Sequence, residues 1–99
     1  MTHKLNCITL NTRGLIDREK RTTIFERCRH QKADIVFLQE THFTNIILKD
    51  ICVEWCGPGY HSLGASNSRG TSILITKNSN ITVLDSKTLN NGRGVLCNI

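Results

Sequence analysis

Two polar residues, Asn11 and Glu40, follow the first two apolar segments of the chain and could together hold a metal ion against a phosphate. A carboxylate beside a buried strand is costly unless it has a partner. Mg²⁺ binds one or two carboxylates while keeping several waters and sharing phosphate oxygens of a substrate. Asn11 offers an amide oxygen to a metal and an NH₂ donor to a phosphate. The alternative, left open at this point, is that both side chains only cap a turn and a helix.

The elements around these residues should bring them together. Residues 5–10 and 34–38 have the apolar character of short strands, and residues 17–32 have apolar side chains at helical spacing, with Asp17 as a suitable N-cap. Strand–helix–strand units usually pair in parallel, so the carboxyl ends of their strands meet at one edge of the sheet. We expect Asn11 and Glu40 to lie close together at that edge, where α/β sheets bind ligands.

The rest of the chain predicts a second helix and four further strands. We expect the helix at residues 45–55 and the strands at residues 60–65, 71–76, 81–84 and 93–99. The first two of these strands should form a hairpin around the turn-rich segment 66–70. Because hairpins are antiparallel and the opening unit is parallel, we predict an α/β fold with mixed β-sheets and flanking helices. The last strand runs to the end of the chain and would leave unpaired sheet edges, so we expect a truncated domain.

Composition limits the classes of protein to which the chain can belong. Its 99 residues fit a single domain, here taken as residues 1–99. The 13 Lys and Arg exceed the 8 Asp and Glu, which favours a polyanionic partner, nucleic acid first. Most of the basic residues between positions 13 and 32 should form a solvated helix face. No stretch is long and apolar enough to span a membrane and no secretory signal is visible, so we expect no membrane association and an intracellular location, cytoplasmic or nuclear.

The cysteines do not suggest a metal or disulfide framework. There are five, an odd number, in a chain without a secretory signal, so reduced thiols are expected. Cys52 and Cys56 have a C-x-x-x-C spacing, but no second pair follows at zinc-finger distance. We expect Cys7, Cys28 and Cys97 to occupy core positions in strands and a helix.

Several motifs resemble the endonuclease/exonuclease/phosphatase superfamily. Residues 8–15, Ile-Thr-Leu-Asn-Thr-Arg-Gly-Leu, resemble its opening strand, and residues 32–42 resemble its next strand, which ends here in Gln-Glu-Thr-His. That ending and residues 66–75 most resemble the apurinic-like endonuclease domain of LINE-type non-LTR retrotransposons. Residues 92–96 resemble a later strand of the same domain. The resemblance covers nearly all of the chain, with the motifs in family order.

The resemblance implies Mg²⁺-dependent hydrolysis of DNA phosphodiester bonds, with Mn²⁺ as a substitute ion. Glu40 would be the principal metal ligand, and Asn11 would organise the metal, the phosphate and the attacking water. A metal in this position acts as a Lewis acid on the phosphoryl oxygen. Arg13 would contact a DNA phosphate near the scissile bond, and a plain surface role for Arg13 is the alternative.

The resemblance also implies supporting residues, a layered fold and further catalytic residues. His42 would support the turn without a catalytic step, and DNA-backbone contacts from Ser68 and Arg69 are the disfavoured reading. Complete family members are four-layer α/β sandwiches, of which this chain would form about half. The family's tyrosine, Asp/Asn pair and Ser-Asp-His segment are not found before the chain ends, so we expect it to be inactive by itself.

Three functions are compatible with these observations. The first is a DNA-nicking endonuclease, and the second is a non-catalytic remnant of a decayed retroelement that binds nucleic acid weakly. The third is a phosphatase of phospholipids or inositol phosphates, which the basic charge and the Gln-Glu-Thr-His ending disfavour. None of the three requires an obligate protein partner.

Overall fold

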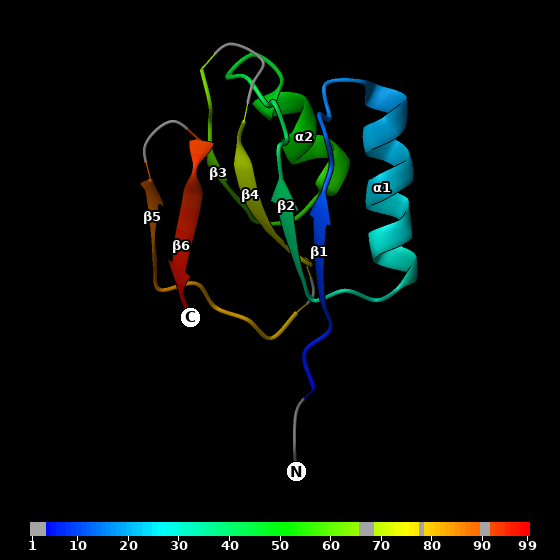
Figure 1. Ribbon diagram of the computed structural model, residues 1–99. Helices are drawn as coiled ribbons and strands as arrows, with labels where there is room; N and C mark the ends of the chain where they lie inside the picture. Colours follow the sequence, from blue (N-terminus) through cyan, green and yellow to red (C-terminus); the bar gives the residue numbers. More distant parts are fainter. Residues whose placement is uncertain (1–3, 66–68, 78, 90–91) are drawn as a thin grey trace.

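Strands and helices follow one another along the chain in a βαβα order that then continues as strands alone (Figure 1). The computed structural model describes residues 4–65, 69–77, 79–89 and 92–99. Within these residues the elements are β1 (Cys7–Asn11), α1 (Arg18–His30), β2 (Ile35–Gln39), α2 (Leu48–Trp55), β3 (Gly59–Ser62), β4 (Thr71–Ile75), β5 (Asp85–Leu89) and β6 (Gly94–Asn98). The α/β class predicted from the sequence is confirmed.

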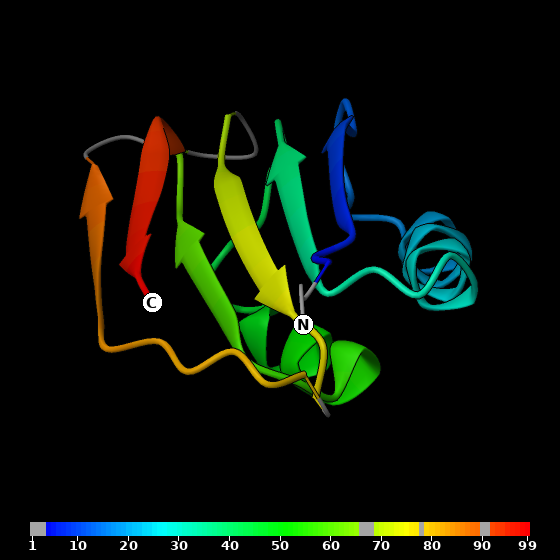
Figure 2. The ribbon, with the colours of Figure 1, turned by 90° about the horizontal axis from the view of Figure 1, so that it is seen from below.

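The strands form two sheets. Four of them are ordered β1-β2-β4-β3, and β5 pairs with β6 in a separate hairpin beside β3 (Figure 2). β1 and β2 are parallel, while β2–β4, β3–β4 and β5–β6 are antiparallel. The predictions of a parallel opening unit, a following hairpin and a mixed sheet are therefore confirmed.

Both helices cover the same face of the four-stranded sheet, and the core lies between the helices and the sheet (Figure 2). Side chains alternate along a strand, so in β2 Val36 and Leu38 are fully buried whereas Phe37 is 38% exposed. Phe25 of α1 and Trp55 of α2 meet edge-on with ring centroids 5.4 Å apart. This contact joins the two helices over the buried face of the sheet.

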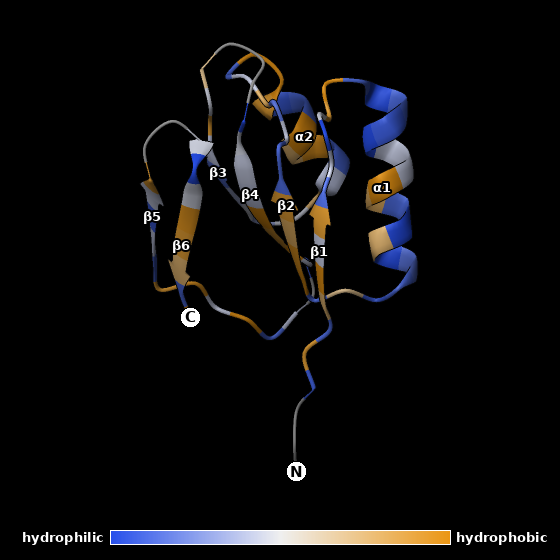
Figure 3. Cartoon of the chain, viewed as in Figure 1, coloured by the Kyte–Doolittle hydropathy of each residue, from blue (hydrophilic) through white to orange (hydrophobic). Residues whose placement is uncertain are grey.

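The sheet becomes more polar toward the carboxyl ends of β1 and β2. Figure 3 shows apolar residues concentrated along the lower part of β1, β2 and β4 and hydrophilic residues at the upper edge. Asn11 and Gln39 close β1 and β2, and both are exposed. A polar ligand can bind at this edge without disturbing the apolar packing of the core.

One predicted strand is misplaced. The structure has no strand at residues 81–84, although Ile81 and Val83 are half-buried; the strand is β5, which follows directly. Pairing with β6 decides its position, since Leu84 N donates to the carbonyl oxygen of Asn98 at 2.7 Å and Asp85 then pairs with Asn98. The apolar run and the later strand at residues 93–99 were both predicted, but the register in which the two segments pair was not.

Two cysteines depart from the predicted core positions. Cys28 is 1% exposed, as expected. Cys7, however, is exposed, because it lies on the outer strand β1 and on the face that the helices leave uncovered, and Cys97 is only half-buried. Among the described residues, neither helix has the length and apolar character needed to cross a membrane.

Candidate active site

The carboxyl ends of β1 and β2 lie side by side at one edge of the sheet. Asn11 is opposite Gln39 in the parallel register, and Thr12 N donates to the carbonyl oxygen of Gln39 at 2.9 Å. Glu40 follows Gln39 directly, and its carbonyl oxygen accepts a hydrogen bond from Gly14 N at 2.7 Å. The register thus agrees with the predicted closeness of Asn11 and Glu40. Asn11 is itself the last residue of β1 rather than the residue after it.

Asn11 uses its side-chain oxygen within its own loop. Its Oδ1 accepts a hydrogen bond from the backbone N–H of Arg13 at 3.3 Å, which closes a turn where Arg13 has a φ of 53°. Lys20 of α1 donates from Nζ to the carbonyl oxygen of Thr12 at 2.7 Å and ties this loop to the helix. An amide oxygen has two lone pairs, so Oδ1 can still accept from a water or bind an ion.

Glu40 combines a constrained backbone with an available carboxylate. Its φ of 52° lies in the left-handed region, which residues other than glycine rarely adopt. Its carbonyl oxygen is held by Gly14 N and by the hydroxyl of Thr12 at 2.9 Å. The side chain is exposed, and its carboxylate makes no hydrogen bond or ion pair with the described residues. The backbone of Glu40 is therefore held in place, while its carboxylate is available to a ligand.

His42 supports the loop that follows Glu40. Its ring lies so close to Gly14 that a Cβ at Gly14 would be 2.8 Å from the His42 Nδ1. Gly14 has a φ of 97°, so glycine is required there both by the backbone and by the ring. This packing is consistent with the supporting role expected of His42.

Residues with positive φ gather in the loops of this edge. They are Arg13, Gly14, Glu40, His42, Arg69, Gly70 and Gly92. Backbone hydrogen bonds join these loops, because His42 N donates to the Arg69 oxygen at 2.7 Å and Gly70 N donates to the Gly92 oxygen at 3.2 Å. Strain of this kind costs about 1–3 kcal/mol per non-glycine residue and concentrates at ligand-binding sites. The loops thus form one connected, constrained unit.

A cavity of about 460 Å³ opens between these loops. It is lined by Gln39, Glu40, Arg69, Gly70, Thr71, Gly92 and Arg93. The structure therefore brings Glu40 together with two arginines, whereas Asn11 and Arg13 lie outside the lining, on the neighbouring strand end and its loop. Arg13 is exposed there. Ser68 lies outside the described residues.

The donor set suits a hard cation held together with its substrate. Among the described residues, no three His, Cys, Asp or Glu side chains are grouped so that they could hold a metal ion. A structural zinc site needs about four such ligands. Mg²⁺ can be bound by one carboxylate with waters and substrate phosphate oxygens. Glu40, with Asn11 on the adjacent strand, fits this second kind of site.

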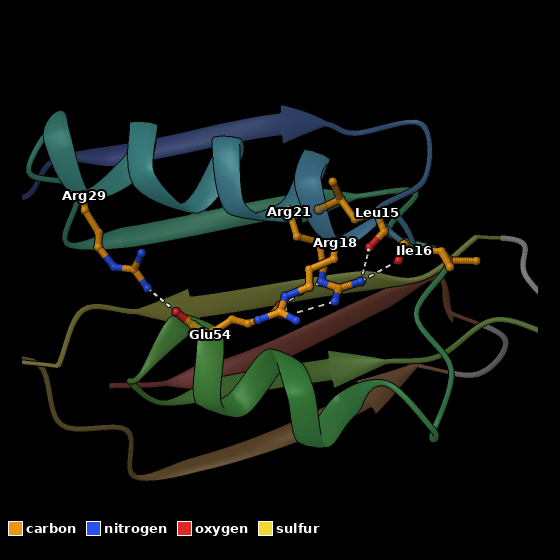
Figure 4. Close-up of polar contacts among 6 residues, drawn as sticks. All are labelled: Leu15, Ile16, Arg18, Arg21, Arg29 and Glu54. Carbon is orange, nitrogen blue, oxygen red and sulfur yellow. Dashed lines mark hydrogen bonds and ion pairs between the residues drawn. The ribbon is translucent and has the colours of Figure 1, made fainter.

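Arg21 fixes the loop that begins at Asn11 against both helices (Figure 4). Its side chain is 4% exposed and donates to both carboxylate oxygens of Glu54 in α2, at 2.8 and 3.0 Å. Its Nη1 also donates to the carbonyl oxygens of Leu15 and Ile16, at 3.2 and 2.6 Å. Arg21 is therefore an exception to the solvated face expected for most of these basic residues, because its side chain is buried against Glu54 of α2.

This ion pair changes the ionisation of its members. The hydrogen bond from Arg21 lowers the pKa of Glu54 below its ordinary 4.5, against the opposing effect of burial.

Arg29 also joins α1 to α2, by donating to the carbonyl oxygens of Glu54 and Trp55, and its guanidinium lies 5.2 Å from the Trp55 ring centroid. The contacts of Arg21 and Arg29 thus hold α1 against α2, and those of Arg21 also hold the loop at Leu15 and Ile16.

Arg93 is the site residue that the sequence did not single out. It lies far along the chain from Glu40, and only the tertiary fold brings it to the same cavity. Arg69 was considered, as a disfavoured DNA contact. A common local signal exists, because each arginine is next to a glycine with positive φ, Gly70 or Gly92. Such pairs are typical of tight loops in which the backbone approaches a neighbour closely.

A second depression lies at the opposite edge of the sheet and offers less chemistry. Its volume is about 660 Å³, and its lining includes Leu5, Ile81 and Leu84 together with Lys4 and Asp34. The Asp34 carboxylate already accepts a hydrogen bond from the backbone N–H of Asn6 at 2.9 Å. Size therefore does not identify the site here, and the strand-end cavity with Glu40 is the better candidate.

No protein-family model matches the chain, and no curated protein matches it. The residues and their geometry therefore carry the functional interpretation.

Proposed function

We propose that the edge bearing Asn11 and Glu40 binds Mg²⁺ together with a phosphodiester of DNA, as part of a retrotransposon-type endonuclease site. The observation that supports this proposal is the parallel register of β1 and β2, in which Asn11 pairs with Gln39, the residue directly before Glu40, whose carboxylate makes no hydrogen bond or ion pair with the described residues. The constrained loops and the basic cavity support it. So does the resemblance of residues 8–15 and 32–42 to the endonuclease/exonuclease/phosphatase superfamily.

Each residue would have a distinct task. Glu40 would hold the metal, with Asn11 completing its shell or donating from its NH₂ group to a phosphate oxygen. The bound metal would supply Lewis-acid stabilisation of charge on the phosphoryl oxygen. Arg13, exposed on the loop after Asn11, would contact a DNA phosphate at the outer side of this edge. In this proposal the protein works inside the cell, in the cytoplasm or nucleus, where its nucleic-acid substrate is found.

Hydrolysis also needs groups that move protons. Among the described residues that line the cavity, Glu40 is the only carboxylate and no histidine is present. We therefore expect the 99-residue chain to bind a phosphodiester but not to cleave it efficiently. In the four-layer sandwich that we propose for the complete fold, the four-stranded sheet and its two helices would be one sheet and one helical layer.

Mn²⁺ binding, followed by electron paramagnetic resonance of the free ion, tests the metal site. We expect Glu40→Gln to weaken Mn²⁺ binding at least about tenfold, because it removes the one charged ligand. Asn11→Ala should have a smaller effect. Glu26→Gln, which removes an exposed carboxylate on α1, is the matched control. Equal binding by the wild type, Glu40→Gln and Glu26→Gln would rule out the proposed metal site.

Nicking of supercoiled plasmid in Mg²⁺ tests the catalytic part separately. We expect the 99-residue chain to give no nicking above background. Robust nicking that is lost in Glu40→Ala would show that the residues of this chain are sufficient for cleavage.

A second candidate function is non-catalytic binding of nucleic acid. It is favoured by the presence of Arg69 and Arg93 in a cavity with a single carboxylate. The two functions differ in their dependence on metal. DNA affinity that is unchanged by Mg²⁺ or Mn²⁺, combined with the absence of nicking, would favour the non-catalytic function.

A further inference from the structure

Two arginines enter the Glu40 cavity from different loops. Arg69 lies just before β4, and Arg93 lies just before β6. Their loops are joined directly, because Gly70 N donates to the carbonyl oxygen of Gly92. Both arginines therefore line one cavity although the segments that carry them are distant in the sequence.

Neither guanidinium has a counter-ion of its own. Both arginines are exposed, and neither forms an ion pair with the described residues. The contrast is with Arg21, whose buried guanidinium is neutralised by Glu54. Two unpaired positive charges in one cavity repel each other, and an anion bound between them would relieve that repulsion. A phosphate matches the planar fork of each guanidinium.

The size of the cavity exceeds what one phosphate requires. Its volume of about 460 Å³ falls within the range of roughly 300–1,000 Å³ typical of pockets for small organic ligands. A water molecule occupies only about 30 Å³. The cavity is wide and opens to solvent, so a nucleotide unit can extend from a phosphate held near Glu40.

Thr71 provides a further polar group at the same place. Its Oγ1 is buried and has no hydrogen-bond partner among the described residues, and Thr71 pairs with Gln39 across the sheet. An unsatisfied buried hydroxyl costs about 1–3 kcal/mol. A ligand acceptor that reached this hydroxyl would satisfy it.

We propose that Arg69 and Arg93 bind the phosphate adjacent to the one held at Glu40, so that the cavity takes two consecutive nucleotides of a strand rather than an isolated phosphate ester. This inference rests on the proposed nucleic-acid function. The arginine contacts themselves need no metal, however, so they can be measured in EDTA, where Glu40 holds no ion.

Fluorescence anisotropy of a labelled single-stranded oligonucleotide in EDTA is the test. We expect the double variant Arg69→Gln/Arg93→Gln to bind about tenfold or more weakly and to lose about 0.7 from the slope of log affinity against log salt, which corresponds to one phosphate contact on a single strand. Arg27→Gln on α1 removes one positive charge from an exposed position outside the cavity and should change affinity less than about twofold. Arg69→Lys/Arg93→Lys should retain the salt slope while losing part of the affinity.

Competition distinguishes two nucleotides from one. With Mg²⁺ present, so that the phosphate position at Glu40 can also be filled, a dinucleotide with a 5′ phosphate should displace the labelled strand at a concentration at least about tenfold lower than a mononucleotide or inorganic phosphate. Equal competition by all three would overturn the two-nucleotide site. Circular dichroism of each variant verifies that it is folded, and the lysine variant provides the same test with the charge preserved.

The outcomes separate this inference from the proposed function. If the double glutamine variant binds DNA as Arg27→Gln does, the arginine site is rejected even when Glu40→Gln abolishes Mn²⁺ binding. If the arginine effect is found and Mn²⁺ binding does not depend on Glu40, the arginine site stands and the metal site is rejected.

Discussion

The helix-covered sheet and the β5–β6 hairpin differ sharply in how they are stabilised. In the sheet, Val36 and Leu74 are fully buried beneath two helices. In the hairpin, every residue of β5 is exposed, and Leu96 of β6 is 58% exposed. The hairpin is connected to the sheet partly by the Ser62 hydroxyl, which donates to the Leu89 oxygen at 2.6 Å.

This difference indicates that the residues that stabilise the fold and the residues that line the candidate site are partly different. Regions with few buried apolar contacts open locally at a lower free energy than the core does. Glu40 is anchored to the stable sheet, whereas Gly92 and Arg93 come from the hairpin segment. The candidate site therefore spans a rigid and a weakly held region, and mutations should affect the two in different ways.

The largest effect should follow from removal of a core ring. Phe25→Ala deletes a side chain that is 1% exposed and its contact with Trp55, and it should lower the free energy of unfolding by about 3–5 kcal/mol. Leu96→Ala in the hairpin should cost within about 0.5 kcal/mol. Urea denaturation measures both. Similar losses for the two variants would refute the proposed division of stability.

The next largest effect should come from the Arg21–Glu54 pair. Glu54→Gln leaves a buried guanidinium without its counter-ion and should cost about 3 kcal/mol at pH 7. Because the pKa of Glu54 is lowered in the folded state, this stabilisation is present above pH 4.5 and is lost as the pH falls below it. The difference between Glu54→Gln and the wild type should thus shrink toward pH 3. A difference that stays constant with pH would contradict the argument.

A smaller and local effect should follow from Gly92→Ala. Gly92 has a φ of 70°, and a Cβ there would lie 2.6 Å from the backbone nitrogens of Gly64 and Gly70. The substitution should cost about 1–2 kcal/mol through strain and should speed hydrogen exchange of the Gly70 amide. Gly94→Ala is the control, since its Cβ would meet only the flexible Leu89 side chain, 2.9 Å away. Unchanged exchange at Gly70 in Gly92→Ala would argue against the loop connection.

The smallest effect concerns His61 beneath the sheet. Burial lowers the pKa of His61 below 6.5, and its Nδ1 lies 2.7 Å from the Ser72 hydroxyl oxygen. The neutral ring is favoured, so stability is fully present above pH 6.5 and declines as the pH falls through the lowered pKa. His61→Asn should remove this part of the pH dependence. An NMR titration midpoint for His61 at or above 6.5 would contradict the expectation.

Local patterns explain why much of the fold was predictable. α1 and β2 have their own periodicity or apolar run, and the parallel direction of β1 and β2 follows from the helical crossover between them. β5 was misplaced because its residues are all exposed and its position depends on pairing with β6. A strand without a buried face has no pattern of its own to recognise.

The candidate site was predictable only where its residues end consecutive strands. Asn11 and Glu40 belong to one local unit, so their closeness could be inferred from the chain order. Arg93 reaches the cavity through a distant hairpin, and Arg21 is buried because Glu54 lies on another helix. Long-range pairing of this kind leaves no mark in the spacing of residues.

The placement of the thiols lets each region report its own opening. Cys28 is a buried residue of α1 and Cys97 is half-buried in the hairpin, and burial raises the pKa of both, which suppresses the reactive thiolate. Cys7, Cys52 and Cys56 are exposed on the folded protein. Alkylation should therefore label these three first, then Cys97 as the hairpin detaches, and Cys28 last. The order of alkylation thus reports the order in which the hairpin and the core open.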